Sequence, residues 1–232
     1  MLIGNKIYKR KQKKQDKITF TTMIITLQKL NIPFLPILDS DIWNKHVSFK
    51  AGNKYHIKAS SGSGKSTLIQ SLYGIQKNYT GDVLFNQKNI KQFSVEETCE
   101  WRATKISIVF QDLKLFEDKT ALENIDIKRA LTNTYPISKM TEFAERLCVA
   151  HTLNRPIQTL SYGERQRVAI IRALMQPFTT LLLDEPFSHL DQQNIELATQ
   201  LIAQELQLRN ATLLLTDLED DNHFEYHQKF AL

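Results

Sequence analysis

The chain has little cysteine: Cys99 and Cys148 are the only two in 232 residues. Neither belongs to a Cys-x-x-Cys or Cys/His arrangement. This pattern excludes a disulfide framework and the ligand spacing of a zinc site. We therefore expect the protein to work in a reducing compartment.

Long hydrophobic runs are also missing. No stretch reaches the roughly 18 uninterrupted apolar residues that a membrane span needs, and the basic start lacks the apolar segment of a signal peptide. We expect the protein to stay where it is made. A role at a membrane would then need separate membrane-spanning partner subunits.

Positive charge is concentrated in one segment, although the whole chain carries a formal charge of +5. Residues 1–22 hold seven Lys or Arg and one Asp, which leaves 23 basic and 24 acidic side chains elsewhere, a balance of −1. The remainder therefore presents no basic face, and we expect no nucleic-acid partner. We expect residues 1–22 to be a solvated, disordered tail. The alternatives are a tail that contacts anionic lipid or nucleic acid, and a true start at Met23.

Hydrophobic patterning indicates an α/β domain. Short apolar runs predict strands at residues 24–27, 55–58, 83–85, 106–110, 181–183 and 212–215. Helical spacing predicts helices at residues 66–73, 139–150, 164–175 and 191–208. Strands that alternate with helices favour an α/β sheet. The section at about residues 91–165 is mostly helical around one strand, which suggests a helical subdomain inserted into an α/β core at residues 23–232.

The first chemical motif is a phosphate-binding loop. Residues 59–67 read Ala-Ser-Ser-Gly-Ser-Gly-Lys-Ser-Thr, between a predicted strand and a predicted helix, as in a P-loop. Glycines let the backbone point its N–H groups at phosphate oxygens, the lysine neutralises phosphate charge, and the serine hydroxyl after it is offered to Mg²⁺. The expected nucleotide-binding residues are Ser60, Ser61, Gly62, Ser63, Gly64, Lys65, Ser66 and Thr67. The alternative is a Gly/Ser turn with a chance lysine.

Ala59 departs from the strict P-loop pattern, because it stands where the first glycine belongs. If this position needs a positive φ, the alanine costs on the order of 1 kcal/mol and loosens the loop.

The second motif is an apolar strand that ends in two acids, Asp184 and Glu185. Alternation along a strand sends adjacent side chains to opposite sides, so the two carboxylates can take different tasks. Asp184 would belong to the Mg²⁺ shell, and Glu185 would orient or deprotonate an attacking water. The alternative is a strand that ends in a solvated acidic turn.

The third motif carries a family resemblance. Residues 160–167 read Leu-Ser-Tyr-Gly-Glu-Arg-Gln-Arg and resemble the signature motif of ATP-binding cassette (ABC) ATPases, usually Leu-Ser-Gly-Gly-Gln. Gln111 resembles the family's Q-loop, and residues 188–191 resemble its D-loop. The motifs stand in the family's order, and the resemblance covers roughly residues 24–230. Segments 106–112 and 120–125 look most like the cassettes of lipoprotein-releasing, macrolide-export and cell-division systems.

The resemblance implies a fold and an assembly. The fold would be a P-loop NTPase with a RecA-like mixed sheet core, an N-terminal antiparallel β portion and a helical insertion. Two cassettes, identical or different, would pair head to tail with ATP between the P-loop of one and the signature of the other. The protein would then drive a membrane-spanning permease from the cytoplasm, as a peripheral protein on the inner face of the cell membrane.

The resemblance also implies roles for individual residues. Glu185 and Gln111 would be catalytic, Ser161 and the backbone around Gly163 would contact the partner's γ-phosphate, and Asp191 would shape the dimer contact. Mg²⁺ would be bound by Ser66, Gln111 and Asp184.

One departure puts hydrolysis in question. The family usually reads Thr-His-Asp after the strand at residues 212–215, its histidine reaching the γ-phosphate, but here Asp217 follows Thr216. A carboxylate near a phosphate adds repulsion where a donor is expected. The alternative function is therefore a degenerate cassette that binds ATP as a regulatory module with little hydrolysis. We expect His223 to be a surface residue and His189 an ordinary turn residue.

Milder departures concern Tyr162, the C-terminus and the adenine contact. Tyr162 replaces the first glycine of the signature's pair, which would narrow its backbone freedom, and the chain ends without the family's longer final β and helical portion. Phe34 is the candidate for stacking on adenine, while Trp43 and Tyr55 are expected in the core. A soluble cassette acting on DNA or ribosomes fits poorly, because the chain lacks a coiled-coil insertion and a second cassette.

Overall fold

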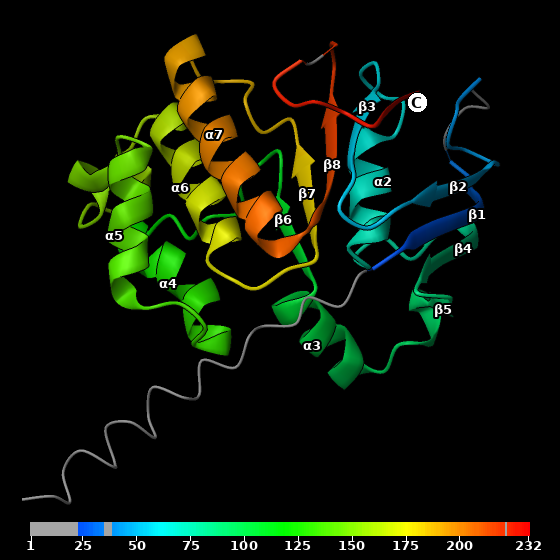
Figure 1. The fold of residues 1–232 in the computed structure, drawn as a ribbon, viewed down its shortest axis with the longest axis horizontal. Helices are drawn as coiled ribbons and strands as arrows, with labels where there is room; N and C mark the ends of the chain where they lie inside the picture. Colours follow the sequence, from blue (N-terminus) through cyan, green and yellow to red (C-terminus); the bar gives the residue numbers. More distant parts are fainter. Residues whose placement is uncertain (1–22, 35–38, 221) are drawn as a thin grey trace, which may run out of the picture.

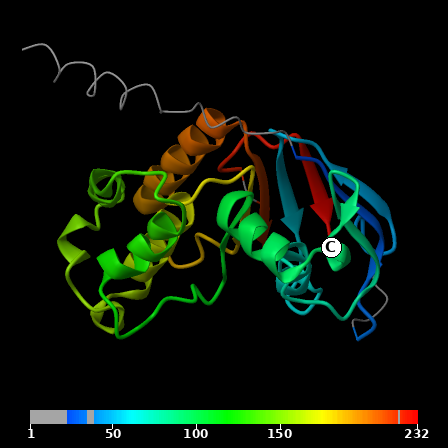
Figure 2. The same ribbon diagram turned by 90° about the horizontal axis from the view of Figure 1, so that it is seen from below.

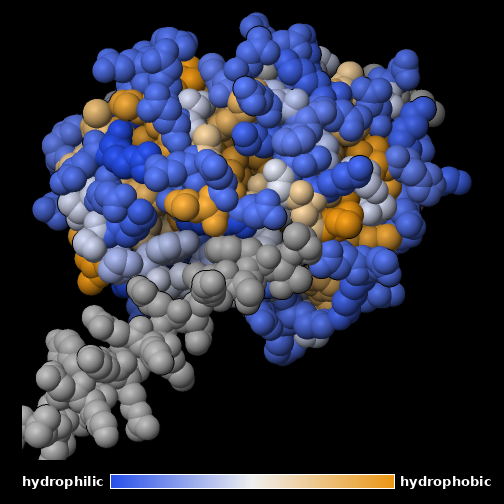
Figure 3. All heavy atoms as spheres, in the orientation of Figure 1, coloured by the Kyte–Doolittle hydropathy of each residue, from blue (hydrophilic) through white to orange (hydrophobic). Residues whose placement is uncertain are grey.

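The computed structural model describes residues 23–34, 39–220 and 222–232. The predicted tail at residues 1–22 lies outside the described residues. Two β-sheets stand side by side, and helices cover the larger one (Figure 1). Hydrophilic residues cover most of the face seen in Figure 3.

The larger sheet has five parallel strands in the order β6-β7-β8-β3-β9. These strands are β3 (Lys54–Lys58), β6 (Ile106–Val109), β7 (Thr180–Asp184), β8 (Thr212–Asp217) and β9 (Gln228–Ala231). The smaller sheet is antiparallel, in the order β2-β1-β4-β5. Its strands are β1 (Ile25–Asn31), β2 (His46–Phe49), β4 (Thr80–Phe85) and β5 (Lys88–Asn89). The α/β class and the antiparallel N-terminal portion are confirmed, with the two strand directions divided between two sheets.

Six helices lie in the described residues, none of them both long and apolar enough to cross a membrane. They are α2 (Lys65–Leu72), α3 (Val95–Thr104), α4 (Ala121–Thr132), α5 (Ile137–Arg146), α6 (Tyr162–Leu174) and α7 (Gln192–Arg209). Helices α4 and α5 lie on the side of the molecule away from the antiparallel sheet (Figure 2). The range 91–165 also contains β6, which is an edge strand of the parallel sheet, so the helices in this range are interrupted by a core strand.

Strand alternation builds a separate core on each face of the parallel sheet. Leu181, Leu183 and Leu213 pack with side chains from α4 to α7. Leu182 and Leu214 point to the other face and pack with α2 and the antiparallel sheet. Because β7 and β8 are buried on both faces, each is a continuous apolar run.

Buried Arg209, paired with Glu205 on the same helix, holds α7 against the end of α6. Arg209 donates to the Glu205 carboxylate at 2.5 Å and to the carbonyl oxygens of Leu174 and Gln176. Its guanidinium also lies 4.0 Å from the ring centre of Phe178. The side chains of Arg209 and Glu205 are only 2% and 4% exposed, so each charge depends on its partner. The contact fixes the helix that begins with the signature residues.

We predict that Glu205→Ala lowers the free energy of unfolding by ~3–5 kcal/mol, because it leaves the Arg209 charge buried and unpaired. Chemical denaturation of the nucleotide-free protein measures this. The exposed Glu196 on the same helix is the control, and Glu196→Ala should change stability by less than about 0.5 kcal/mol. Equal losses in the two variants would contradict the role of the pair.

Candidate nucleotide-binding site

The site forms where the parallel strands end. β3 leads into the P-loop, β7 ends at Asp184, and β6 is followed within two residues by Gln111. Because β7 and β3 flank β8 in one parallel sheet, their carboxyl ends meet at the same edge. Ligands of open α/β sheets bind at this edge.

The P-loop has the backbone that the glycines predict. Gly64 adopts φ 99° and immediately precedes α2, and Gly62 adopts φ 82°. The loop surrounds a cavity of about 230 Å³, lined by Ser61, Gly62, Gly64, Lys65, Ser66, Thr67, Gln111 and Glu185. Ser63 is buried instead, and its hydroxyl donates to the carbonyl of Ser60 at 2.7 Å.

Ala59 shows that the missing first glycine leaves no strain. Its φ is not positive, in contrast to those of Gly62 and Gly64. Ala59 is buried and continues the strand pairing, because its N–H donates to the carbonyl of Asp217 at 3.0 Å. The expected cost therefore does not arise: this position needs no left-handed backbone.

A buried ion pair occupies the centre of the site. The Nζ atom of Lys65 lies 3.3 Å from a carboxylate oxygen of Glu185, and the two side chains are 6% and 8% exposed. Lys65 also donates to the carbonyls of Ala59 and Ser60, at 3.1 and 3.4 Å. A phosphate entering the cavity would compete with Glu185 for this ammonium group.

Gln111 connects the two motifs. Its side-chain nitrogen donates to Glu185 at 3.1 Å, and its side-chain oxygen accepts a hydrogen bond from Ser66 at 3.3 Å. Ser66 therefore links the P-loop to the Q-loop, and Gln111 links the Q-loop to Glu185. Lys65, Ser66, Gln111 and Glu185 form one connected network.

The donor set near Ser66 fits Mg²⁺. Ser66, Gln111 and Asp184 offer a hydroxyl, an amide oxygen and a carboxylate, which are the hard oxygen ligands that Mg²⁺ prefers. They line a neighbouring cavity of about 340 Å³. The described residues contain no group of three or more His, Cys, Asp or Glu able to hold a metal ion. Such a donor set suits an ion that keeps waters and phosphate oxygens as further ligands.

The surroundings of Asp184 disfavour the charged form of its carboxyl group. Burial raises its pKa above 3.8, and the nearby Glu185 carboxylate acts in the same direction. Hydrogen bonds from Ser66 and Thr216 and the charge of Lys65 partly offset this rise. The Thr216 hydroxyl lies 2.8 Å from the carboxylate. A bound metal ion would offset the repulsion between the Asp184 and Glu185 carboxylates.

The signature residues begin α6 in a capping box. The Ser161 hydroxyl accepts from the backbone N–H of Glu164, while the Glu164 carboxylate accepts from the backbone N–H of Ser161. A Cβ atom on Gly163 would lie 3.1 Å from the carbonyl oxygen of His189, which explains the glycine there. Tyr162 is the first helical residue, and its φ is not positive. Ser161 and Gly163 are not among the residues that line the 230 Å³ cavity of their own subunit.

Gln166 contacts the candidate site and was not singled out by the sequence analysis. Its side chain, 1% exposed, donates to the carbonyl of Glu185 and accepts from the N–H of His189, both at 3.3 Å. Glu185 itself adopts a positive φ of 47°. The buried amide thus supports the left-handed turn that positions the Glu185 carboxylate. The only sequence feature that could have pointed to Gln166 is its position in the helix predicted at residues 164–175.

Asp217 ends β8 and is half-buried beside the start of the P-loop. Its carboxylate accepts from the N–H of Leu218 at 2.7 Å. His223 is exposed, as predicted, with its ring centre 5.5 Å from that of Phe187. His189 is an exposed turn residue, also as predicted, but it packs against Tyr162.

The remaining candidates divide between core and surface. Trp43 and Tyr55 are buried as predicted, and Trp43 donates to the carbonyl of Ser63 in the P-loop at 3.2 Å. Phe34 is 57% exposed, and its role in adenine stacking stays a prediction. Asp191 caps α7 by accepting from the N–H of Asn194, so its role in a dimer also stays a prediction. Both cysteines are free and exposed.

We predict that Asp184→Asn raises the melting temperature of the nucleotide-free protein at neutral pH by a few degrees. A raised folded pKa means that the carboxyl group favours folding fully below pH 3.8 and loses this contribution as the pH rises through the folded value. The gain should therefore shrink as the pH falls, which calorimetry at a series of pH values measures. The control is Asp112→Asn, because that carboxylate is exposed. A gain that grows with acidity would contradict the account.

Comparison with known proteins places this geometry in a family. Residues 43–188 match the family described as ABC transporter. The fold is similar to the dimeric structure of MJ0796, a bacterial ABC transporter cassette, with 25% sequence identity and a TM-score of 0.73 over 84% of this chain and 88% of that chain. It is equally similar, by the same measures, to a dimeric post-hydrolysis state of the ATP-binding cassette MJ0796 bound to ADP and Pi. The P-loop, the acidic strand end and the signature helix thus belong to one known architecture, and the chain is an ATP-binding cassette of the ABC transporter family.

Proposed function

We propose that this cassette binds Mg²⁺-ATP and hydrolyses it between two cassettes, in order to drive a membrane-spanning permease. The observation that carries the proposal is the connected network of Lys65, Ser66, Gln111 and Glu185 at the ends of β3, β6 and β7, with Asp184 beside it. These side chains supply a lysine for phosphate, oxygen ligands for Mg²⁺ and a general base, although the family's histidine is missing after Thr216. Residues 23–232 would act as one ATPase domain.

The network assigns a task to each side chain. Lys65 would move from Glu185 to the β- and γ-phosphates, and Ser66, Gln111 and Asp184 would hold Mg²⁺, which neutralises phosphate charge when bound. Glu185, released by Lys65 and still bonded to Gln111, would orient and deprotonate the attacking water. The remaining residues of the P-loop from Ser60 to Thr67 would cradle the phosphates through their backbone N–H groups.

The signature supports a site shared by two cassettes. Ser161 is exposed at the start of α6, where a helix N-terminus attracts anions, and Gly163 lies two residues further along the chain. Ser161 lies outside the cavity of its own P-loop and is therefore available to a nucleotide on a second subunit. The dimers of the similar cassette MJ0796 agree with such an assembly. A second cassette could be the same chain or a different one.

Asp217 favours the regulatory alternative. Its backbone carbonyl accepts a hydrogen bond from Ala59 at the start of the P-loop, so the residue adjoins the loop although it does not line the 230 Å³ cavity. Repulsion between this carboxylate and the γ-phosphate would slow hydrolysis without preventing binding. A slow cassette of this kind would regulate a partner by its ATP-bound dimer.

We predict that purified protein at dimer-forming concentrations hydrolyses Mg²⁺-ATP, and that Glu185→Gln lowers turnover by about 10²–10⁴-fold through loss of the general base. Asp217→His should raise turnover, because it replaces a repelling group with a donor. The control is Asp220→Asn, which removes an exposed carboxylate three residues away that pairs with Lys58. Turnover that survives Glu185→Gln would contradict the proposed chemistry, and activity found only in Asp217→His would establish the regulatory alternative.

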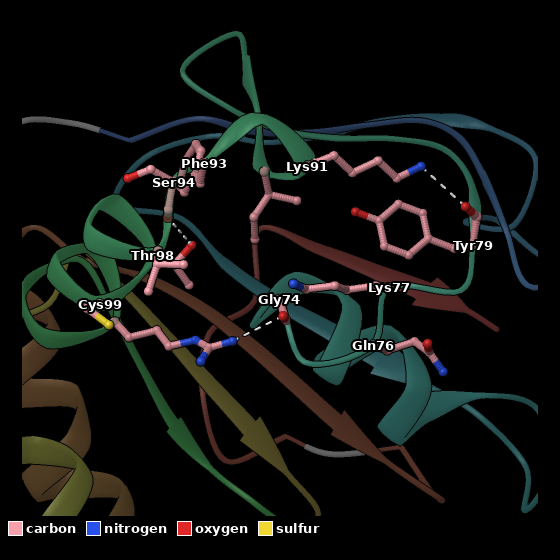
Figure 4. A pocket seen from close by; sticks show the side chains of 12 residues that line it. Gly74, Gln76, Lys77, Tyr79, Lys91, Phe93, Ser94, Thr98 and Cys99 are labelled. Atoms are coloured by element: carbon pink, nitrogen blue, oxygen red, sulfur yellow. Dashed lines mark hydrogen bonds between the residues drawn. The ribbon is translucent and has the colours of Figure 1, made fainter.

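A third cavity supports contact with a permease. It measures about 370 Å³ and lies between the end of α2, the segment from Tyr79 to Phe93, and α3 (Figure 4). Three of its lining residues are cationic, namely Lys77, Lys91 and Arg102, and no lining residue is acidic.

We propose that an acidic cytoplasmic segment of the permease docks in this cavity, because its charge would complement the cations and its apolar residues would contact Ile90 and Phe93. The cassette would then work on the cytoplasmic face of the membrane.

We predict that Lys77→Glu weakens binding of the cassette to membranes of its own cells severalfold, as measured by co-sedimentation. Lys119→Glu, an exposed lysine outside the cavity, should leave binding unchanged. A thiol-to-amine cross-linker should join Cys99, which lines the cavity, to a membrane-spanning protein, whereas Cys148 should not react with that protein. Equal effects of the two lysine variants would rule out docking at this cavity.

A further inference from the structure

Tyr162 stands where the family's signature has a glycine, and its side chain reaches two other loops of the same subunit. The hydroxyl donates to the backbone carbonyl of Gln111 at 3.0 Å. The ring centre lies 4.2 Å from that of His189, in the D-loop. The Tyr162 side chain thus contacts both the Q-loop, at Gln111, and the D-loop, at His189.

These contacts hold Gln111 at both ends. Its side-chain amide bonds to Ser66 and Glu185 on the phosphate side, while its backbone carbonyl bonds to Tyr162 on the signature side. Tyr162 also lines the 340 Å³ cavity together with Ser66 and Asp184. If a bound phosphate or metal ion shifts the Gln111 amide, the backbone of Gln111 would move with it. The hydrogen bond to Tyr162 would then carry this movement to the start of α6.

The D-loop is tied to the same helix start by close packing. A Cβ atom at Gly163 would lie only 3.1 Å from the His189 carbonyl oxygen, a tight contact, and the His189 N–H is bonded to Gln166. The D-loop and the first turn of α6 therefore move together. A glycine in place of Tyr162 would keep this packing but lose the bond to the Q-loop.

We propose that Tyr162 is a positioning residue that couples nucleotide binding in one P-loop to the signature and D-loop of the same subunit. The coupling sets the geometry of Ser161, which that subunit presents to its partner's nucleotide. The inference rests on the proposed shared site, but the coupling itself lies within one chain.

The test compares wild type with Tyr162→Phe, which removes only the hydroxyl, and with Tyr162→Gly, which restores the family's residue. Hydrogen exchange is measured on dilute, monomeric protein with and without Mg²⁺-ADP. In wild type, nucleotide should slow exchange in the P-loop and also at residues 160–166 and 187–191. In both variants the slowing should remain in the P-loop and be lost from the other two segments. Tyr226→Phe, the same chemical change at a tyrosine that lines none of the three cavities, should behave as wild type.

Steady-state kinetics give a second readout that a merely structural role would not produce. Tyr162→Phe should lower kcat by about threefold to tenfold, the range that one lost hydrogen bond corresponds to, with KM for ATP changed by less than about twofold. Absence of turnover in wild type would refute hydrolysis but not the coupling, which the exchange experiment decides alone. The proposal is overturned if nucleotide leaves residues 160–166 unaffected in wild type, or if Tyr162→Phe retains the wild-type exchange pattern.

Discussion

The buried ion pair between Lys65 and Glu185 is the contact on which the site depends. It joins the first residue of α2 to the residue after β7, so it exists only because β3 and β7 end at the same edge of a parallel sheet. Neither charge would be tolerated at this depth alone. In the structure each charge therefore neutralises the other, and the proposed catalysis would require a phosphate to replace Glu185 beside Lys65.

The rest of the architecture keeps the elements of this network in register. The two-sided leucine core fixes β7 and β8, and the Glu205–Arg209 pair fixes the far end of the signature helix. At the near end, Gln166 and Tyr162 connect that helix to Glu185 and Gln111. The groups proposed to bind the phosphate and those proposed to face a second cassette are thus parts of one packed unit.

The sequence predicted the features that depend on local pattern and failed where distant contacts decide. The strand–P-loop–helix unit and the acidic strand end follow from alternation and glycine placement, and both lie where predicted. Helices α3 and α4 and the edge strands β2, β5 and β9 were not resolved individually, because their apolar positions are few or irregular. The P-loop motif raised the question whether position 59 needs a positive φ. Pairing with β8 sets the φ of Ala59, and this φ is not positive. The links made by Gln166 and Tyr162 join residues 19 to 51 positions apart, which no local pattern encodes.

The central claim is that Lys65 exchanges Glu185 for phosphate when nucleotide enters. Trp43 is bonded to the P-loop carbonyl of Ser63, so its fluorescence should report the event in a Trp101→Phe background. We would titrate this protein with Mg²⁺-ATP and repeat the titration with Lys65→Ala. The account predicts a saturable change that is lost, or displaced to far higher ATP, in Lys65→Ala. Equal affinity in the two proteins would show that the Lys65–Glu185 pair is not the phosphate site and would contradict the account.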